Sequence, residues 1–205
     1  MKLHYSPGAC SLGIHLLLEE TGAPFEAVLT NLREGAQFSP EFTSLNPKSK
    51  VPTLVRDDGS VLTEFTAIAW WIAASFPAAK LMPATTEGVA RALEATDYAV
   101  ATIHMQGFSR IFRPGNFAPS EADHEAVKAR GMEIFRKGLA VMDKCLEGRD
   151  HVAGDFSFGD AGLFYVSYWG AARLNLELPR NVAGHFARMK ARPAVQRAMA
   201  REGLA

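Results

Sequence analysis

Tyr5-Ser6-Pro7-Gly8-Ala9-Cys10-Ser11 connects a short segment of alternating apolar residues to a pattern that predicts a helix over 10–21. A strand therefore runs into a loop, and Cys10 lies where the helix begins. The first backbone N–H groups of a helix have no partner inside it, and the helix dipole places partial positive charge there. Such a position stabilises a thiolate, so we expect a lowered pKa for Cys10 and take it as the first candidate for chemistry. A small buried thiol is the alternative interpretation.

The composition is typical of a globular protein, because 48% of the 205 residues are hydrophobic and 21% are charged. The 22 basic and 22 acidic residues cancel, so the chain lacks the basic excess that favours nucleic acid or an anionic membrane. The most apolar window, 65–76, is too short to cross a bilayer. The two cysteines form no disulfide framework, and the first residues lack a signal-peptide pattern, so we expect a cytoplasmic protein.

The first 76 residues predict a small mixed sheet with helices packed against it. The elements follow the order strand, helix, strand, short helix, strand, strand, helix. A strand–helix–strand unit implies a parallel pair with a right-handed crossover. Asp57-Asp58-Gly59-Ser60 indicates a tight turn, which adds an antiparallel hairpin to that pair.

Strand patterns nearly vanish after a proline-containing linker at 77–86. Helical patterns then follow over 87–113, 120–147, 157–174, 180–191 and 193–203. We therefore expect two domains, an α/β domain over 1–76 and an all-helical domain over 87–205. Aromatic residues at helical spacing, among them Trp70, Phe135 and Phe164, indicate core packing.

Several features of the α/β domain could converge on one ligand: Cys10, the Val51-Pro52 step, the helix start at Glu64, and Arg33 after the second strand. A proline ahead of an extended segment leaves the main chain of Val51 open to a strand-like ligand, and Pro52 is a candidate for a cis bond. Glu64 can face an ammonium group, while the N–H groups after it suit a carboxylate. A peptide-like ligand with a thiol, an amine and carboxylates matches this set, although Glu64 can also be a plain first-turn residue.

Motifs along nearly the whole chain resemble the bacterial beta-class glutathione S-transferases. In the first half they are Tyr5–Ser11, Asn46-Pro47-Lys48, Val51-Pro52-Thr53-Leu54, Asp57-Asp58-Gly59 and Leu62-Thr63-Glu64. In the second half they are Gly107-Phe108, Ile111-Phe112-Arg113-Pro114 and Phe156-Ser157-Phe158-Gly159-Asp160. The resemblance implies a thioredoxin-like domain with a mixed four-stranded sheet, a C-terminal helical bundle and a homodimer.

The resemblance also implies that the reactive thiol belongs to glutathione. Cys10 would face the glutathione sulfur, either polarising it or forming a mixed disulfide, with Ser11 and Tyr5 as hydroxyl donors in reserve. Val51 would pair its main chain with the cysteinyl part of glutathione, with Pro52 in the cis form.

The charged ends of glutathione would be held by other residues. The resemblance assigns Glu64 and the N–H of Phe65 to the γ-glutamyl end, and Arg33 to the glycyl carboxylate. Relatives tend to have a small or hydroxylic residue at the position of Phe65. A side-chain hydrogen bond is therefore lost here unless Thr66 supplies it.

The family places a histidine near the sulfur on the first long helix, with an apolar second-substrate site against the same helix. Counting back from Gly107-Phe108 puts the histidine position on Met105, and His104 lies one residue earlier. One residue is a rotation of about 100° in an α-helix, so either the register differs by one or the histidine has moved. His104 is the catalytic candidate, and the second-substrate candidates are Met105, Phe108 and Phe112.

The leading hypothesis is a glutathione transferase that joins the glutathione thiolate to small hydrophobic electrophiles and needs no metal. Two alternatives remain open. One is a glutathione-dependent thiol–disulfide reductase or reductive dehalogenase that uses Cys10. The other is a scaffold of the same fold that binds ligands without catalysis. Asp160 is excluded from the catalytic candidates because Ser157 and Asp160 have the spacing of a helix capping box.

Overall fold

The computed structural model describes residues 1–204, which contain one mixed sheet of four strands. The strands are β1 (Lys2–Tyr5), β2 (Glu26–Leu29), β3 (Thr53–Val55) and β4 (Val61–Thr63), in the spatial order β2-β1-β3-β4. β1 and β2 run parallel, whereas the β1–β3 and β3–β4 pairs are antiparallel. The predicted thioredoxin-like arrangement, a crossover unit followed by a hairpin, is confirmed.

Helices make up most of the remaining chain. Within the first part they are α1 (Ser11–Thr21), η1 (Ala36–Phe38), α2 (Pro40–Leu45) and α3 (Phe65–Ser75). After η2 (Pro77–Ala79) they are α4 (Thr86–Asp97), η3 (Tyr98–Phe108), α5 (Ser109–Phe112), η4 (Pro114–Asn116), η5 (Glu121–Asp123), α6 (His124–Cys145), α7 (Phe158–Tyr168), η6 (Trp169–Arg173), α8 (Arg180–Ala191) and α9 (Pro193–Arg201). No helix among residues 1–204 is long and apolar enough to cross a membrane.

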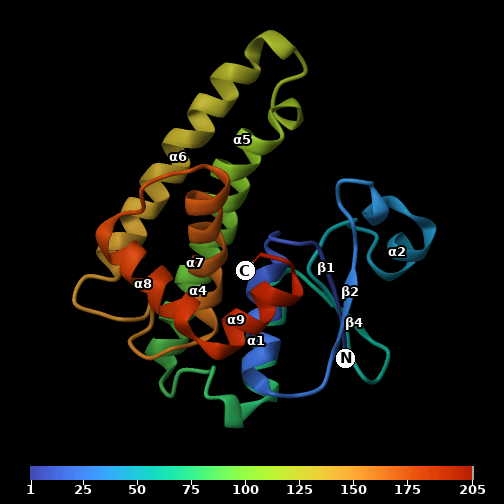
Figure 1. The fold of residues 1–205 in the computed structure, drawn as a ribbon, viewed down its shortest axis with the longest axis vertical. Coiled ribbons are helices and arrows are strands. Elements are labelled where there is room, and N and C mark those ends of the chain that lie inside the picture. Colours follow the sequence, from blue (N-terminus) through green and yellow to red (C-terminus); the bar gives the residue numbers. More distant parts are fainter. Residues whose placement is uncertain (205) are drawn as a thin grey trace.

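Helix α1 lies between the sheet and the helical part of the molecule (Figure 1). It packs against α7 and α9, so the end of the chain returns to a helix near its start. Buried apolar side chains form one continuous cluster, from Leu3 in β1 to Val195 in α9. Phe135 and Phe164 belong to this core as predicted, but the prediction for Trp70 is wrong, because this residue is 45% exposed on the outer side of α3.

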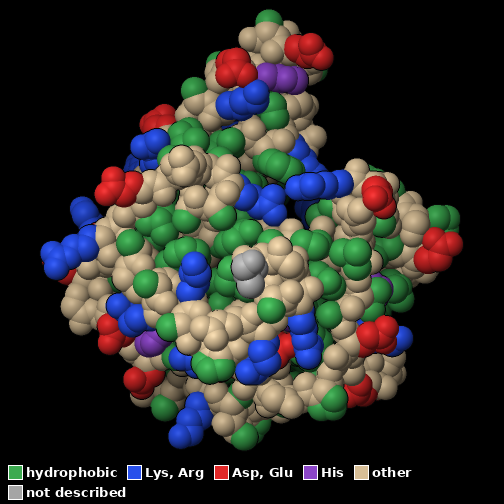
Figure 2. Space-filling view, viewed as in Figure 1, with side chains coloured by type: hydrophobic (Ala, Val, Ile, Leu, Met, Phe, Trp, Pro, Cys, Tyr) green, Lys and Arg blue, Asp and Glu red, His purple; other side chains and the backbone are tan. Residues whose placement is uncertain are grey.

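Local sequence accounts for the ends of several helices. Gly22 ends α1 in the left-handed conformation (φ 67°), and its N–H donates to the carbonyl oxygen of Glu19. Ser157 and Asp160 form the predicted capping box at the start of α7. On the face shown in Figure 2, basic and acidic side chains are scattered rather than gathered into one block, which agrees with the balanced charge of the sequence.

The helix predicted over 87–113 is continuous but contains a π-helical segment, η3. Its last turn shows the wider spacing, because Ser109 N–H donates to the carbonyl oxygen of His104, five residues earlier. A second π-helical segment, η6, ends with Leu174 N–H donating to the carbonyl oxygen of Trp169 at 3.0 Å. Such segments hold more residues per turn than an α-helix, so positions counted at 100° per residue do not keep their face.

Candidate active site

The loop between β1 and α1 is held by residues from the other end of the chain. Gly8 donates its N–H to Oε2 of Glu202 at 2.8 Å, and Nε1 of Trp169 donates to the Gly8 carbonyl oxygen at 2.7 Å. Nη2 of Arg173 donates to the carbonyl oxygens of Pro7 and Gly8. Position 8 favours glycine, because φ is 64° and a Cβ would displace Nη2 of Arg173, which would lie 2.6 Å away.

The thiol of Cys10 faces the Val51-Pro52 step, whose peptide bond is cis as predicted. Sγ donates to the carbonyl oxygen of Val51 at 3.4 Å. Burial raises the pKa of the Cys10 thiol to about 12, although the N–H of Ser11 and the charge of Lys50 act in the opposite direction. The expectation of a lowered pKa is therefore wrong, because the helix start does not replace the hydration that burial removes. Cys10 is a neutral hydrogen-bond donor at physiological pH.

Ser11 and Tyr5 support the loop. The side chain of Ser11 is fully buried, and its Oγ donates to the carbonyl oxygen of Ser6 and accepts from the N–H of Ser6. The ring of Tyr5 packs against His15, with 5.4 Å between centroids. His15 in turn lies 2.8 Å from Oε1 of Glu202. The two hydroxyl candidates thus belong to the framework that holds Cys10.

Glu64 precedes α3 with a positive φ of 70°, which is uncommon for a residue other than glycine. Its carboxylate accepts from Nζ of Lys48 at 2.7 Å. The first hydrogen bond within α3 runs from Ile68 N–H to the carbonyl oxygen of Glu64, so the preceding amides have no partner inside the helix. A carboxylate and unpaired amides therefore lie side by side at this helix start.

Phe65 turns its ring inward, away from that helix start. The side chain is 5% exposed and lies against Tyr165, with 5.1 Å between centroids. It occupies space left open by Gly13 on α1, where a Cβ would lie 2.7 Å from two ring atoms. The large side chain therefore leaves the amide of Phe65 at the start of α3.

Gly13→Ala is expected to lower the free energy of unfolding by about 1–3 kcal/mol, as overpacking does in a tight core. The added Cβ would meet both the ring of Phe65 and, at 2.8 Å, the backbone oxygen of Ala161. Urea denaturation measures the effect. Gly184→Ala on α8 is the matched control, because its Cβ would meet only the flexible end of Arg188. A Gly13→Ala protein as stable as the wild type would contradict the described packing.

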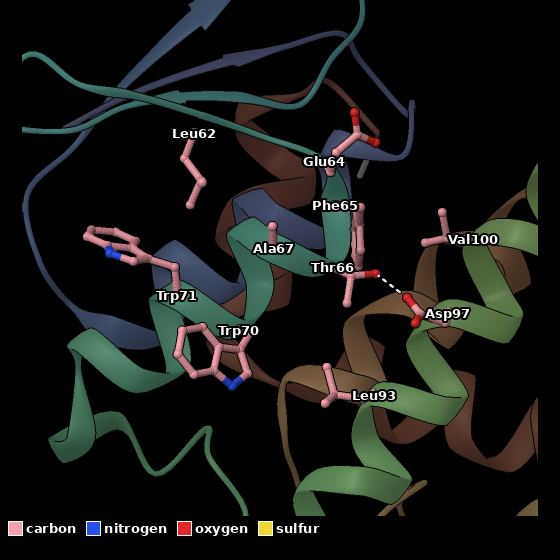
Figure 3. Close-up of a pocket in the computed structure, with 10 residues that line it drawn as sticks. All are labelled: Leu62, Glu64, Phe65, Thr66, Ala67, Trp70, Trp71, Leu93, Asp97 and Val100. Atoms are coloured by element: carbon pink, nitrogen blue, oxygen red, sulfur yellow. Dashed lines mark hydrogen bonds between the residues drawn. The ribbon is translucent and has the colours of Figure 1, made fainter.

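The remaining glutathione candidates differ in their surroundings. Oγ1 of Thr66 donates to Oδ1 of Asp97 at 2.7 Å, which joins α3 to α4 (Figure 3). Arg33 is exposed, and within residues 1–204 its side chain makes no hydrogen bond or ion pair. The positive charge of Lys50 acts to lower the pKa of both Cys10 and His104. Lys50 was not among the residues predicted from the sequence. Its place directly before the Val51-Pro52 step was the available signal.

His104 faces the interior, whereas Met105 is 39% exposed. Nδ1 of His104 lies 3.4 Å from Oη of Tyr165, and the imidazole packs edge-on to Trp169. Burial, reinforced by the charges of Lys50 and Arg113, lowers the pKa of His104 to about 4. The histidine is neutral at physiological pH, and the π-helical geometry of η3 accompanies its inward orientation.

An aromatic series continues from His104 toward the surface. Trp169 stacks on Phe108 with 4.1 Å between centroids, and Phe108 stacks on Phe112, which is 59% exposed. Trp169 was missed by the sequence analysis, although it follows the apolar helical pattern that begins at 157. Because its N–H also holds Gly8, this side chain joins the Cys10 loop to the apolar series.

Comparisons with known proteins agree with this arrangement. Residues 8–75 match the family described as Glutathione S-transferase, N-terminal domain. Glutathione S-transferase GstA of Escherichia coli O157:H7 is 36% identical, and the alignment covers all of both chains. A sphingomonad glutathione S-transferase complexed with glutathione is 38% identical over both full chains, with a TM-score of 0.86. A beta-class enzyme from Sphingomonas chungbukensis has the same TM-score and coverage at 34% identity. The full-length alignments, the sequence identity and the shared fold show that the chain belongs to the glutathione S-transferase family.

Proposed function

We propose that this transferase joins the glutathione thiolate to small hydrophobic electrophiles at the surface formed by Phe108, Phe112 and Met105. The observation that supports it most is the neutral Cys10 thiol beside the cis Val51-Pro52 step. A thiol with a raised pKa is a poor nucleophile but can donate a hydrogen bond to a glutathione sulfur. That sulfur would release its proton to solvent, form a bond to carbon and displace the leaving group.

Each part of glutathione has a proposed contact. The main chain of Val51 pairs with the cysteinyl part, and Glu64 with the amide of Phe65 holds the γ-glutamyl end. Thr66 adds a hydroxyl next to that end. Arg33 is proposed for the glycyl carboxylate. The polar groups of neutral His104 and Tyr165 are proposed to lie beside the glutathione sulfur.

Conjugation of glutathione to 1-chloro-2,4-dinitrobenzene tests this function directly. The initial rate, followed by absorbance, should saturate with glutathione and exceed the uncatalysed rate. Isothermal titration calorimetry should show glutathione binding to the same preparation. A folded protein that binds glutathione but gives no rate enhancement would favour the scaffold alternative, and one that does not bind it would overturn the proposed site.

Cys10→Ala is expected to reduce conjugation by about fivefold, because it removes one hydrogen bond worth about 1 kcal/mol. A reductase or dehalogenase that forms a mixed disulfide on Cys10 would instead lose all activity. Steady-state kinetics of the purified variant measure the difference. Cys145→Ala is the control, because this second thiol is remote from Val51. Complete loss of conjugation in Cys10→Ala would contradict the transferase mechanism proposed here.

We further propose that the protein works as a homodimer in the cytoplasm, where thiols are kept reduced. A groove of about 760 Å³ lies between α3 and α4, with Trp70, Trp71, Leu62 and Leu93 among its lining residues (Figure 3). An exposed apolar groove of this kind favours contact with a second chain.

Trp70→Glu is expected to convert the dimer to a monomer by placing a charge in that contact. Light scattering after size-exclusion chromatography measures the change in mass. Phe38→Glu is the matched control, because Phe38 is 67% exposed and does not line the groove. A wild-type protein that is monomeric, or a Trp70→Glu protein that stays dimeric, would contradict the proposed interface.

A further inference from the structure

Three side chains that the transferase site does not use converge near the start of α7. Oδ1 of Asp160 lies 3.3 Å from Nδ1 of His151 and 2.9 Å from Nε2 of His185. His151 follows α6, Asp160 lies in the first turn of α7, and His185 belongs to α8. These three ligand-type atoms all lie within 4.8 Å of one another.

The carboxylate at the centre is held in one orientation. Its Oδ2 accepts from the N–H and the hydroxyl of Ser157, and its Oδ1 accepts from the N–H of Val152 at 3.1 Å. The side chain of Asp160 is fully buried. Its hydrogen bonds therefore fix the carboxylate in one orientation, with Oδ1 next to both imidazoles.

The distances fit a small tetrahedral metal ion. Bonds of about 2.0–2.1 Å from Zn²⁺ to nitrogen or oxygen place neighbouring ligand atoms about 3.3 Å apart. Oδ1 of Asp160 lies 3.3 Å from Nδ1 of His151 and 2.9 Å from Nε2 of His185. Both separations therefore match the expected distance between neighbouring ligand atoms to within about 0.4 Å. Only the separation of the two imidazoles would need to shrink, and His151 lies outside the regular helices.

The site also offers an approach from solvent. The side chains of Asp160 and His185 are fully buried, but that of His151 is 17% exposed. A metal entering beside His151 would find two imidazoles and one carboxylate, a ligand set that suits Zn²⁺ and leaves a fourth position for water. On binding, each ring nitrogen that faces Asp160 would give its proton to solvent.

We propose that His151, Asp160 and His185 form a binding site for a divalent transition metal, with Zn²⁺ as the fitting ion. Because the three ligands come from the segment after α6, from α7 and from α8, the ion cross-links them. Its effect is on the stability of the helical part, since Cys10 and the glutathione candidates are held by other residues.

Titration of the chelator-treated full-length protein with ZnCl₂ and CoCl₂ tests this site. We expect one equivalent to bind, a rise in melting temperature with Zn²⁺, and the visible absorption of tetrahedral Co²⁺. His151→Ala and His185→Phe should each weaken binding by at least about tenfold and abolish the rise in melting temperature. His124→Ala, which removes a histidine on α6 outside the cluster, should bind like the wild type.

His151→Ala keeps the test decisive if His185→Phe does not fold, because His151 is partly exposed. Circular dichroism without metal establishes that the variants are folded. Metal binding that is undiminished in His151→Ala, the absence of binding at micromolar metal, or Co²⁺ spectra with thiolate absorption would each overturn the proposal.

Discussion

Asp160→Ala is expected to lower the free energy of unfolding by about 3–5 kcal/mol, measured by urea denaturation in the presence of a chelator. The fully buried side chain accepts hydrogen bonds from Ser157, Val152, His185 and the partly exposed His151. Removing it leaves buried donors on Ser157, Val152 and His185 without their acceptor, and a buried donor without a partner is left with its full desolvation cost. The start of α7 also loses half of its capping box.

Two further variants make this prediction specific. Asp155→Ala, an exposed carboxylate in the same loop, should change stability by less than about 0.5 kcal/mol. Asp160→Asn should fall between the two, because it keeps the shape and one acceptor oxygen but loses the charge. If Asp160→Ala were as stable as Asp155→Ala, the buried network around α7 would have no role in folding.

Glu64→Ala is expected to weaken glutathione binding by about 10- to 100-fold, which corresponds to about 1.5–3 kcal/mol for a hydrogen bond between charged groups. The carboxylate stands at the start of α3, next to amides that have no partner inside the helix. An ammonium and a carboxylate on one ligand can use both features at once. Lys48 occupies the carboxylate in the free protein, so the ligand must displace an exposed ion pair of small energy.

Isothermal titration calorimetry and the KM for glutathione measure this effect. Glu64→Gln separates charge from shape, since it retains a side-chain oxygen in the same strained backbone position (φ 70°). Glu87→Ala on α4 is the control, because that residue forms an exposed pair with Arg91. Unchanged affinity in Glu64→Ala would mean that the γ-glutamyl end binds elsewhere.

The sequence predicted the sheet, the helix ends and the cis bond because each depends on neighbouring residues. Gly22 ends α1 through its own conformation, and Asp160 reaches Ser157 only three positions away. The prediction that the Val51-Pro52 bond is cis is likewise local, since only proline makes that form common.

The errors concern properties that depend on distant parts of the chain. The pKa of Cys10 is raised by the burial of the thiol in the folded protein, which a helix start in the sequence cannot reveal. The choice between His104 and Met105 was left open for a related reason, because a count at 100° per residue does not hold in the π-helical segment η3. Trp169 and Glu202 reach the first loop from more than 160 positions away, so no local pattern connects them to Gly8.

The contacts of Gly8 also govern when the protein can become active during its synthesis. The loop that carries Cys10 leaves the ribosome early, but its partner Glu202 is added 194 residues after Gly8. A ribosome-bound chain therefore has an unsupported loop even after its sheet has formed, because chains emerge from the N-terminus. The loop gains this anchor only after residue 202 has emerged, so a chain cut before that residue would lose the hydrogen bond between Gly8 and Glu202.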